Sequence, residues 1–368
     1  MSAHELLIAV MAAFALLGGL DRIFGNRLGL GKEFESGILA MGSLAMAMVG
    51  IICLAPLLAR LLRPVIVPVY TALGADPAMF AGTLLACDMG GAPLAMELTE
   101  NRDAALLGGV IAGSMLGATV VFTIPVSMGL LPEKEHPALA KGILCGVVTI
   151  PVGILVGGLT AGYAPAMVLR NLIPIVLIAL LIALGLAKWE NAMIRGFAAF
   201  AKGITALITL GLACGIVEEL TGFAILPGLA SVQEGFLTVG SIAIVLAGAF
   251  PLVAVVTRLL RKPLMKLGGL LGVNDAAAAG LIASLANSLA MLGMVEQMDE
   301  RGKVVNIAFA VSAAFVFGDH LGFTAGFAPE LLLPMILGKL AGGISAAAVA
   351  LLLTRPGCGV DKSGRFGV

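Results

Sequence analysis

The chain has 368 residues, of which 60% are hydrophobic and 12% charged, and its 22 basic and 22 acidic residues balance to zero net charge. Soluble domains average about 25% charged residues, so this composition excludes a water-soluble fold and predicts an all-α polytopic membrane protein. The lack of a basic tract argues against a nucleic-acid partner. Five scattered cysteines without a Cys-x-x-Cys pair support neither a disulfide framework nor a zinc site.

Apolar runs long enough to cross a bilayer recur along the chain. An α-helix needs about 20 apolar residues to cross the hydrocarbon core. Hydropathy predicts nine such spans: 5–20, 36–59, 104–130, 138–162, 166–187, 197–217, 237–257, 304–327 and 331–353. The first run follows His4 and Glu5 rather than a basic stretch, so we interpret it as a span and not as a signal peptide.

Two shorter apolar segments are interrupted by small or polar residues. The first, Asp76–Thr99, is broken at Cys87–Gly91, and the second, Asn274–Met298, is broken at Ala286–Ser288. The two segments lie 198 positions apart and align without a gap. Broken hydrophobic segments at corresponding places in two halves indicate the binding site of a transporter.

The interrupted segments suggest how the chain is organised. We interpret 1–368 as one transmembrane domain whose repeat halves cover approximately 36–130 and 237–327, with linking helices over 138–217. The string Arg-Leu-Leu-Arg at 60–63 recurs at 258–261, which supports the repeat.

Lysine and arginine placement indicates whether the interrupted segments cross the bilayer, because cytoplasmic loops collect basic residues. If both segments are re-entrant hairpins, all but five of the 22 basic residues are cytoplasmic; the exceptions are Arg60, Arg63, Arg102, Arg170 and Lys339. If both segments span, the basic residues divide almost evenly. Each arm of about 11 residues gives roughly 16 Å of helix, which reaches the middle of the bilayer core. We therefore predict two re-entrant helical hairpins that enter from opposite faces as inverted repeats.

Asp88, Asp319 and His320 are the ionisable residues that we select inside the apolar segments, where charge is costly and marks functional sites. Asp88 lies at the tip of the first hairpin, and Asp319 and His320 lie inside the run 304–327. The two carboxylates could balance a small organic cation. As alternatives, Asp88 could cap the second hairpin arm, and Asp319 could pair with His320. His320 also suits proton coupling, because histidine changes its charge near physiological pH.

Uncharged residues complete the predicted substrate site. Asn287 and Ser288 form the tip of the second hairpin and can bind a hydroxyl, or can satisfy backbone groups freed by the break. Ser114 and Ser312 add polar groups on flanking spans, although such hydroxyls often bond to their own helix. The ring of Phe317 can attract an ammonium group, or can simply pack.

Several motifs of enzymes are missing. The sequence contains no GxxxxGK[ST] phosphate loop, no HExxH and no GxSxG elbow. We therefore predict a protein that is not an enzyme and that carries no cofactor or metal ion.

Long strings of this sequence closely resemble the ethanolamine-utilisation membrane protein family. They lie in Phe34–Pro56, Pro64–Gly91 and Arg301–Gly326, and include FAGTLLACDMGG and FVFGDHLGFTAG. The resemblance covers nearly the whole chain. One departure is Ala290, which stands where the family usually has a proline in the second hairpin tip.

The resemblance implies a permease that imports ethanolamine across the bacterial inner membrane and is linked in function to the enzymes of the ethanolamine microcompartment. Ethanolamine is mostly an ammonium ion at neutral pH, and it fits Asp88 and Asp319 through its charge and Asn287 or Ser288 through its hydroxyl. We expect a secondary carrier or facilitator with alternating access. The alternatives are a channel for small cations or neutral solutes, and a membrane scaffold for microcompartment proteins. The glycine-rich spans would tolerate the close contacts of a homo-oligomer.

Overall fold

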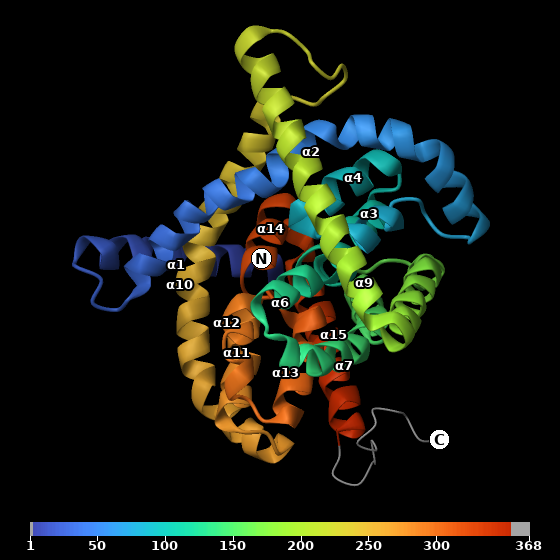
Figure 1. The fold of residues 1–368 in the computed structure, drawn as a ribbon. Coiled ribbons are helices and arrows are strands. Elements are labelled where there is room, and N and C mark those ends of the chain that lie inside the picture. The colour runs from blue at the N-terminus through green and yellow to red at the C-terminus, as the bar shows by residue number, and fades with distance from the viewer. Residues whose placement is uncertain (1–2, 355–368) are drawn as a thin grey trace.

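The computed structural model describes residues 3–354, and the side chains of 3–4 and 260–270, including that of Arg261 in the repeated string, lie outside the description. The described part is helical and contains no strand (Figure 1). Seven stretches in it are long and apolar enough to cross a membrane: Glu5–Ile23, Leu30–Ala72, Arg102–Leu130, Glu133–Thr160, Pro165–Thr221, Val232–Leu259 and Pro329–Leu353. The all-α prediction is confirmed, whereas the count of nine spans is not.

The count differs from the prediction at two places. The runs 166–187 and 197–217 both belong to α9 (Pro165–Thr221), which continues through a kink at Trp189 (φ −136°, ψ 47°). The run 304–327 is not one helix, because its backbone leaves helical geometry between α13 and α14.

Three long helices form one side of the molecule: α1 (Ala3–Ile23), α2 (Leu30–Ala72) and α10 (Val232–Leu271). Figure 1 shows α2 curving across the upper part of the view. Pro56, Pro64 and Pro68 lie inside this helix. Each proline removes a backbone hydrogen bond and its ring clashes with the preceding turn, which explains the curvature.

The interrupted segments are built from short helices. The first hairpin contains α3 (Met79–Leu84), the 3-10 turn η1 (Cys87–Met89) and α4 (Gly91–Leu98). The second hairpin contains α11 (Asp275–Ala286), α12 (Ser288–Leu292) and η5 (Val295–Gln297). The remaining elements are α5 (Arg102–Leu106), η2 (Leu107–Gly117), η3 (Thr119–Thr123), α6 (Ile124–Leu130), η4 (Glu133–Glu135), α7 (His136–Val147), α8 (Ile150–Thr160), α13 (Glu300–Ala313), α14 (Asp319–Phe327), η6 (Pro329–Leu331) and α15 (Leu332–Leu353).

The stretch Arg102–Leu130 is the centre of the fold. Its apolar window is 94% buried, against 17% to 61% for the other long stretches. Glycines let the first hairpin approach it closely: a Cβ at Gly117 would overlap the carbonyl of Leu85, and one at Gly82 would overlap the carbonyl of Gly108. Such contacts between backbones are typical of helices in lipid, where small residues form the interfaces. They hold the first hairpin tip at a defined depth in the molecule.

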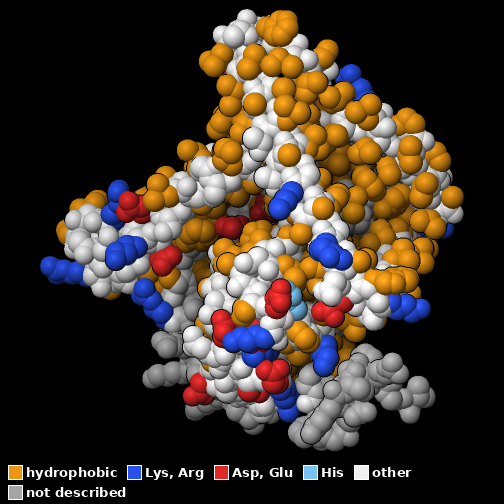
Figure 2. Space-filling view, in the orientation of Figure 1, with side chains coloured by type: hydrophobic (Ala, Val, Ile, Leu, Met, Phe, Trp, Pro, Cys, Tyr) orange, Lys and Arg blue, Asp and Glu red, His pale blue; other side chains and the backbone are white. Residues whose placement is uncertain are grey.

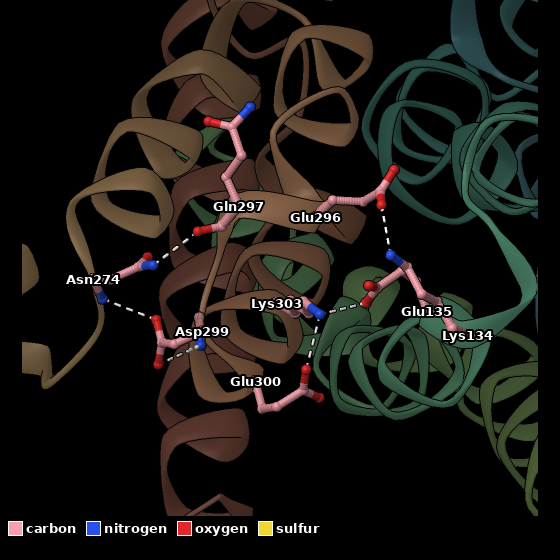
Figure 3. Close-up of polar contacts among 9 residues, drawn as sticks. Lys134, Glu135, Asn274, Glu296, Gln297, Asp299, Glu300 and Lys303 are labelled. Carbon is pink, nitrogen blue, oxygen red and sulfur yellow. Dashed lines mark hydrogen bonds and ion pairs between the residues drawn. The ribbon is translucent and has the colours of Figure 1, made fainter.

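A polar cluster holds the base of the second hairpin (Figure 3). Lys303 Nζ lies 2.6 Å from Glu135 Oε2 and 2.8 Å from Glu300 Oε1, and the first of these pairs is buried on both sides. Lys134 Nζ lies 2.7 Å from Glu296 Oε2 at the surface. This hydrogen bond, together with the charge of the ammonium, holds the pKa of the Glu296 carboxyl below its ordinary value. The cluster joins the second hairpin to the turn that precedes α7.

Candidate functional site

The first hairpin loses helical geometry at its tip. Leu85 and Ala86 are extended, the turn η1 carries Asp88, and Gly90 (φ 95°) precedes α4. Residues with a side chain rarely adopt this φ, and a Cβ at Gly90 would also overlap the side chain of Ile51. The turn that positions Asp88 therefore depends on a glycine.

Hydrogen bonds close the base of each hairpin. Thr99 Oγ1 donates to Asp76 Oδ2 at 2.9 Å in the first hairpin. In the second, the backbone N–H of Asn274 donates to Asp299 Oδ1 at 2.8 Å, and its amide Nδ2 donates to the carbonyl of Gln297 at 2.9 Å (Figure 3). Each segment therefore folds back and ends beside the residue where it begins.

The second hairpin breaks at Asn287, which is extended (φ −155°) between α11 and α12. Asn287 Oδ1 accepts a hydrogen bond from the backbone N–H of Leu289 at 2.8 Å, so the side chain caps α12. This is the structural role that the sequence left open as an alternative. The adjacent Ser288 is buried, and its hydroxyl has no hydrogen-bond partner among the described residues.

A third break separates α13 from α14, and it corrects the prediction of one continuous span over 304–327. Phe315 has a positive φ of 62°. The backbone N–H groups of Phe315 and Phe317 donate to the carbonyls of Ser284 and Leu285 at 3.1 and 2.9 Å. Because the end of α11 supplies these acceptors, the chain can leave the helix inside the protein without losing its backbone hydrogen bonds.

The three breaks surround one cavity of about 170 Å³. Asp88 reaches it from the first hairpin, Asn287 from the second, and Asp319 and His320 from the first turn of α14. Its remaining wall is formed by Ala86, Met89, Ala118, Phe122, Leu289 and Phe315. Pockets for drug-sized ligands have volumes of about 300–1,000 Å³, so this cavity suits a molecule of only a few non-hydrogen atoms. Figure 2 shows acidic groups recessed in the middle of a largely apolar face.

Asp88 does not cap the second arm of its hairpin. Gly90 is the N-cap of α4, and no side chain bonds to the first turn of that helix. The Asp88 side chain is 15% exposed, and it faces the same cavity as Asp319. Two carboxylates at one small space with apolar walls attract a cation strongly, because little solvent screens them.

His320 contacts Asp88 rather than Asp319, its neighbour in sequence. Its Nε2 lies 3.8 Å from Asp88 Oδ1, and no ion pair joins His320 to Asp319, both of which the structure describes. The Nδ1 atom is buried without a hydrogen-bond partner among the described residues, and the ring centre lies 5.4 Å from that of Phe315. The alternative in which Asp319 and His320 satisfy each other is therefore not observed.

Lys339 is a charged residue that the sequence analysis misplaced. The charge count assigns it to an outer loop, but it lies in the middle of α15 with 1% of its surface exposed. Its Nζ donates to the carbonyl of Ser114 at 2.5 Å, and the adjacent Gly113 packs against the backbone of Cys87, which precedes Asp88. The signal in the sequence was a single lysine inside the apolar run 331–353, since an ionisable residue inside a span indicates function.

The two predicted serines lie near the cavity without lining it. Ser114 Oγ donates to the carbonyl of Ile111 at 2.9 Å, which is the bond to its own helix that the sequence left open. Ser312 is buried against Gly342, and its hydroxyl has no hydrogen-bond partner within the part of the chain that the structure describes. Their roles toward a substrate stay predictions.

Two aromatic rings that the prediction did not select line the cavity. Phe122 and Phe315 contact each other edge to face, with ring centres 5.4 Å apart. The predicted Phe317 lies in the wall of a neighbouring cavity instead. Phe315 therefore lines the small cavity in place of the predicted Phe317. The positive φ of Phe315 explains this difference, because it redirects the chain between these two residues.

The neighbouring cavity has a volume of about 430 Å³ and is lined by Phe317, Glu33 and Arg258 among others. Asn287 and Asp319 line both cavities. These two residues therefore form the wall between the small cavity and the larger one.

When both carboxylates are ionised and Lys339 is protonated, the charges of the site favour a monovalent cation over a divalent metal ion. Cys87, Asp88 and His320 bring a thiol, a carboxylate and an imidazole within 4.8 Å of one another, and these groups can bind transition metals. With the thiol and imidazole neutral, however, Asp88, Asp319 and Lys339 leave a single negative charge. An ammonium ion neutralises this charge, whereas a divalent ion leaves an excess positive charge beside Lys339.

Comparison with known proteins identifies the family. The family described as "Ethanolamine utilisation protein, EutH" matches residues 3–353. The chain belongs to the EutH family. A EutH relative from Listeria monocytogenes, named as a probable ethanolamine permease, is 57% identical over 353 residues, which cover 96% of this chain and 95% of the relative. Relatives with the same name from Salmonella typhimurium and Escherichia coli are each 47% identical over 391 residues, with 96% of both chains covered.

No solved structure matches the chain. EutH relatives carry the name of a permease, and the described residues of this EutH protein include seven long apolar helices. The chain is thus a multi-pass protein of the bacterial cell membrane, which is the inner membrane in cells that have two.

Proposed function

We propose that this EutH protein is a carrier that moves ethanolamine, as its ammonium ion, across the bacterial membrane. The names of its relatives support the substrate. The observation that carries the proposal is the small cavity that Asp88 and Asp319 face together. A buried carboxylate replaces the hydration that the ammonium loses, and a charge-assisted hydrogen bond is roughly twice as strong as a neutral one.

The other residues of the cavity match the rest of the substrate. The side chain of Asn287 lies at the cavity and keeps its amide N–H groups available for a hydroxyl, because only its Oδ1 is used to cap α12. Phe122 and Phe315 offer ring faces to an ammonium ion. The cavity volume of about 170 Å³ restricts the substrate to small amines.

The two hairpins support transport by alternating access. In Figure 1, α3 and α4 lie above the centre of the view, and α11 and α12 lie below it. Each hairpin is closed at its base by hydrogen bonds, and the tips meet at the cavity through Asp88 and Asn287. Inverted repeats around a fixed site near the midplane are typical of secondary transporters. We infer that the hairpins enter from opposite faces and that movement at their tips exposes the site to each side in turn.

The larger cavity offers a route from the site to one side. Glu33 and Arg258 line it, and Arg258 belongs to the basic residues that the charge distribution places in the cytoplasm. The wall that separates it from the small cavity contains Asn287 and Asp319. We infer that a substrate leaving toward the cytoplasm passes between these two side chains.

Uptake into proteoliposomes tests the proposal. Labelled ethanolamine should enter with saturable kinetics, and unlabelled ethanolamine inside the vesicles should accelerate entry, because a carrier exchanges substrate across a single site. Varying the pH gradient and the membrane potential separately will identify coupling. Entry that neither saturates nor responds to internal substrate would instead show a channel, and absence of entry beyond that of empty liposomes would refute ethanolamine transport.

A further inference from the structure

We propose that Lys339 is a built-in counter-ion that lets the carrier change its orientation when the site is empty. This inference rests on the proposed function. It assigns a role in transport to a residue of α15 that does not line the substrate cavity.

The position of Lys339 is that of an internal charge. Its side chain is 1% exposed, and one hydrogen bond, from Nζ to the carbonyl of Ser114 at 2.5 Å, fixes its end. No carboxylate of the described residues forms an ion pair with it, but the glycine next to Ser114 packs against the tip of the first hairpin: a Cβ at Gly113 would lie 3.1 Å from the backbone nitrogen of Cys87, the neighbour of Asp88. An isolated buried charge is costly, so the acidic groups of the site are what make this ammonium tolerable.

The ammonium is held too far from the carboxylates to block them. A lysine in direct contact with Asp88 would occupy the place of a substrate cation. Here Nζ is bonded to the carbonyl of Ser114, and neither Lys339 nor Ser114 is among the residues that line the cavity of about 170 Å³. Lys339 can therefore reduce the negative charge of the site without filling it.

A count of charges shows what Lys339 changes. With Asp88 and Asp319 ionised and Lys339 protonated, the empty site carries one net negative charge, and the site with bound ethanolammonium is neutral. Without the ammonium of Lys339, the loaded site would carry one negative charge, which the wild-type carrier already tolerates when empty. The empty site would then carry two negative charges, a state with no counterpart in the wild-type cycle.

The variant Lys339→Met should consequently become an exchanger. The loaded variant can still reorient, so it should exchange labelled for unlabelled ethanolamine at a rate within about threefold of wild type. When its binding site is empty, the variant must change its orientation with two uncompensated carboxylates. Net uptake into vesicles without internal ethanolamine should therefore fall at least about tenfold. Lys141→Met, which removes an exposed lysine of α7, is the matched control and should leave both rates unchanged.

A second variant tests the charge count itself. Lys339→Met combined with Asp319→Asn returns the empty site to one negative charge. The ratio of net uptake to exchange should return toward the wild-type ratio, even if removal of Asp319 weakens binding. A variant that lost only packing around Lys339 would not respond to the second substitution in this way.

The outcomes separate this inference from the proposed function. If Lys339→Met supports net uptake at the wild-type rate, Lys339 is not the counter-ion, although ethanolamine transport stands. If the folded variant also loses exchange, the inference is equally overturned. If the variant fails to fold, Lys339→Gln takes its place, because glutamine is neutral but can still donate to the carbonyl of Ser114. Failure of wild-type exchange would refute the proposed function itself.

Discussion

Among single residues, Asp88 and Asp319 determine what the cavity attracts. Both carboxylates face a space too small to hold many water molecules, and apolar side chains form most of the remaining wall. His320 contacts Asp88, whereas no ion pair joins Asp319 to another of the described residues. We therefore assign the main contact with the substrate ammonium to Asp88.

The variant Asp88→Asn tests this assignment. A hydrogen bond to a charged group contributes about 1.5–3 kcal/mol, so affinity for ethanolamine should fall by about tenfold to a hundredfold. Equilibrium binding of labelled ethanolamine to purified protein measures the change. Asp103→Asn makes the same substitution at an exposed position of α5 and should bind like wild type. Equal affinity of the two variants would remove Asp88 from the binding site.

The sequence predicted much of this residue set because charge inside an apolar run is rare and costly. Asp88, Asp319 and His320 were predicted on that basis and Asn287 as the polar tip of the second hairpin, and the structure brings all four to one cavity. Lys339 was missed because counting basic residues by side of the membrane treats each as a loop residue. Its place inside the apolar run 331–353 indicated burial, but its partner, the carbonyl of Ser114, lies 225 residues earlier and depends on tertiary structure.

At the scale of elements, the site is formed where helices stop. Both interrupted segments could be predicted because glycine, asparagine and serine visibly break an apolar run. The break between α13 and α14 could not, since Ala314–Phe317 is as apolar as the helices around it. That break depends on carbonyl groups at the end of α11, more than 25 residues earlier in the chain. It is therefore a product of tertiary structure.

Gly90 provides a test of how strictly the first hairpin tip is specified. Gly90→Ala forces a Cβ into a residue with φ 95° and against Ile51, while Gly74→Ala forces one into φ 71° with no atom nearby. The backbone penalty of about 1–2 kcal/mol applies to both, and only Gly90→Ala adds overpacking of about 1–3 kcal/mol. Thermal unfolding in detergent should show a larger decrease of the melting temperature for Gly90→Ala, together with loss of uptake. Equal decreases with uptake retained would show that the tip rearranges at little cost.

At the scale of the whole molecule, the tips of the two hairpins meet at a charged cavity, while their bases lie apart. The central stretch Arg102–Leu130 is almost wholly buried, and the first hairpin packs closely on it through glycines. The base of the second hairpin is joined to the turn before α7 by the exposed ion pair of Glu296 and Lys134. Both hairpin tips are thus fixed to neighbouring elements, the second through the hydrogen bonds that Phe315 and Phe317 donate to the carbonyls of Ser284 and Leu285.

The proposed inverted repeat predicts that the two hairpin bases face opposite sides of the membrane. Glu100 and Glu296 are exposed residues at the bases of the first and second hairpin. Each can be replaced by cysteine in a background without native cysteines; four of these, Cys53, Cys87, Cys145 and Cys214, are buried. A maleimide that cannot cross membranes should label Glu100→Cys in right-side-out vesicles and Glu296→Cys in inside-out vesicles. Labelling of both positions from the same side would contradict the inverted repeat and, with it, alternating access through hairpins that enter from opposite faces.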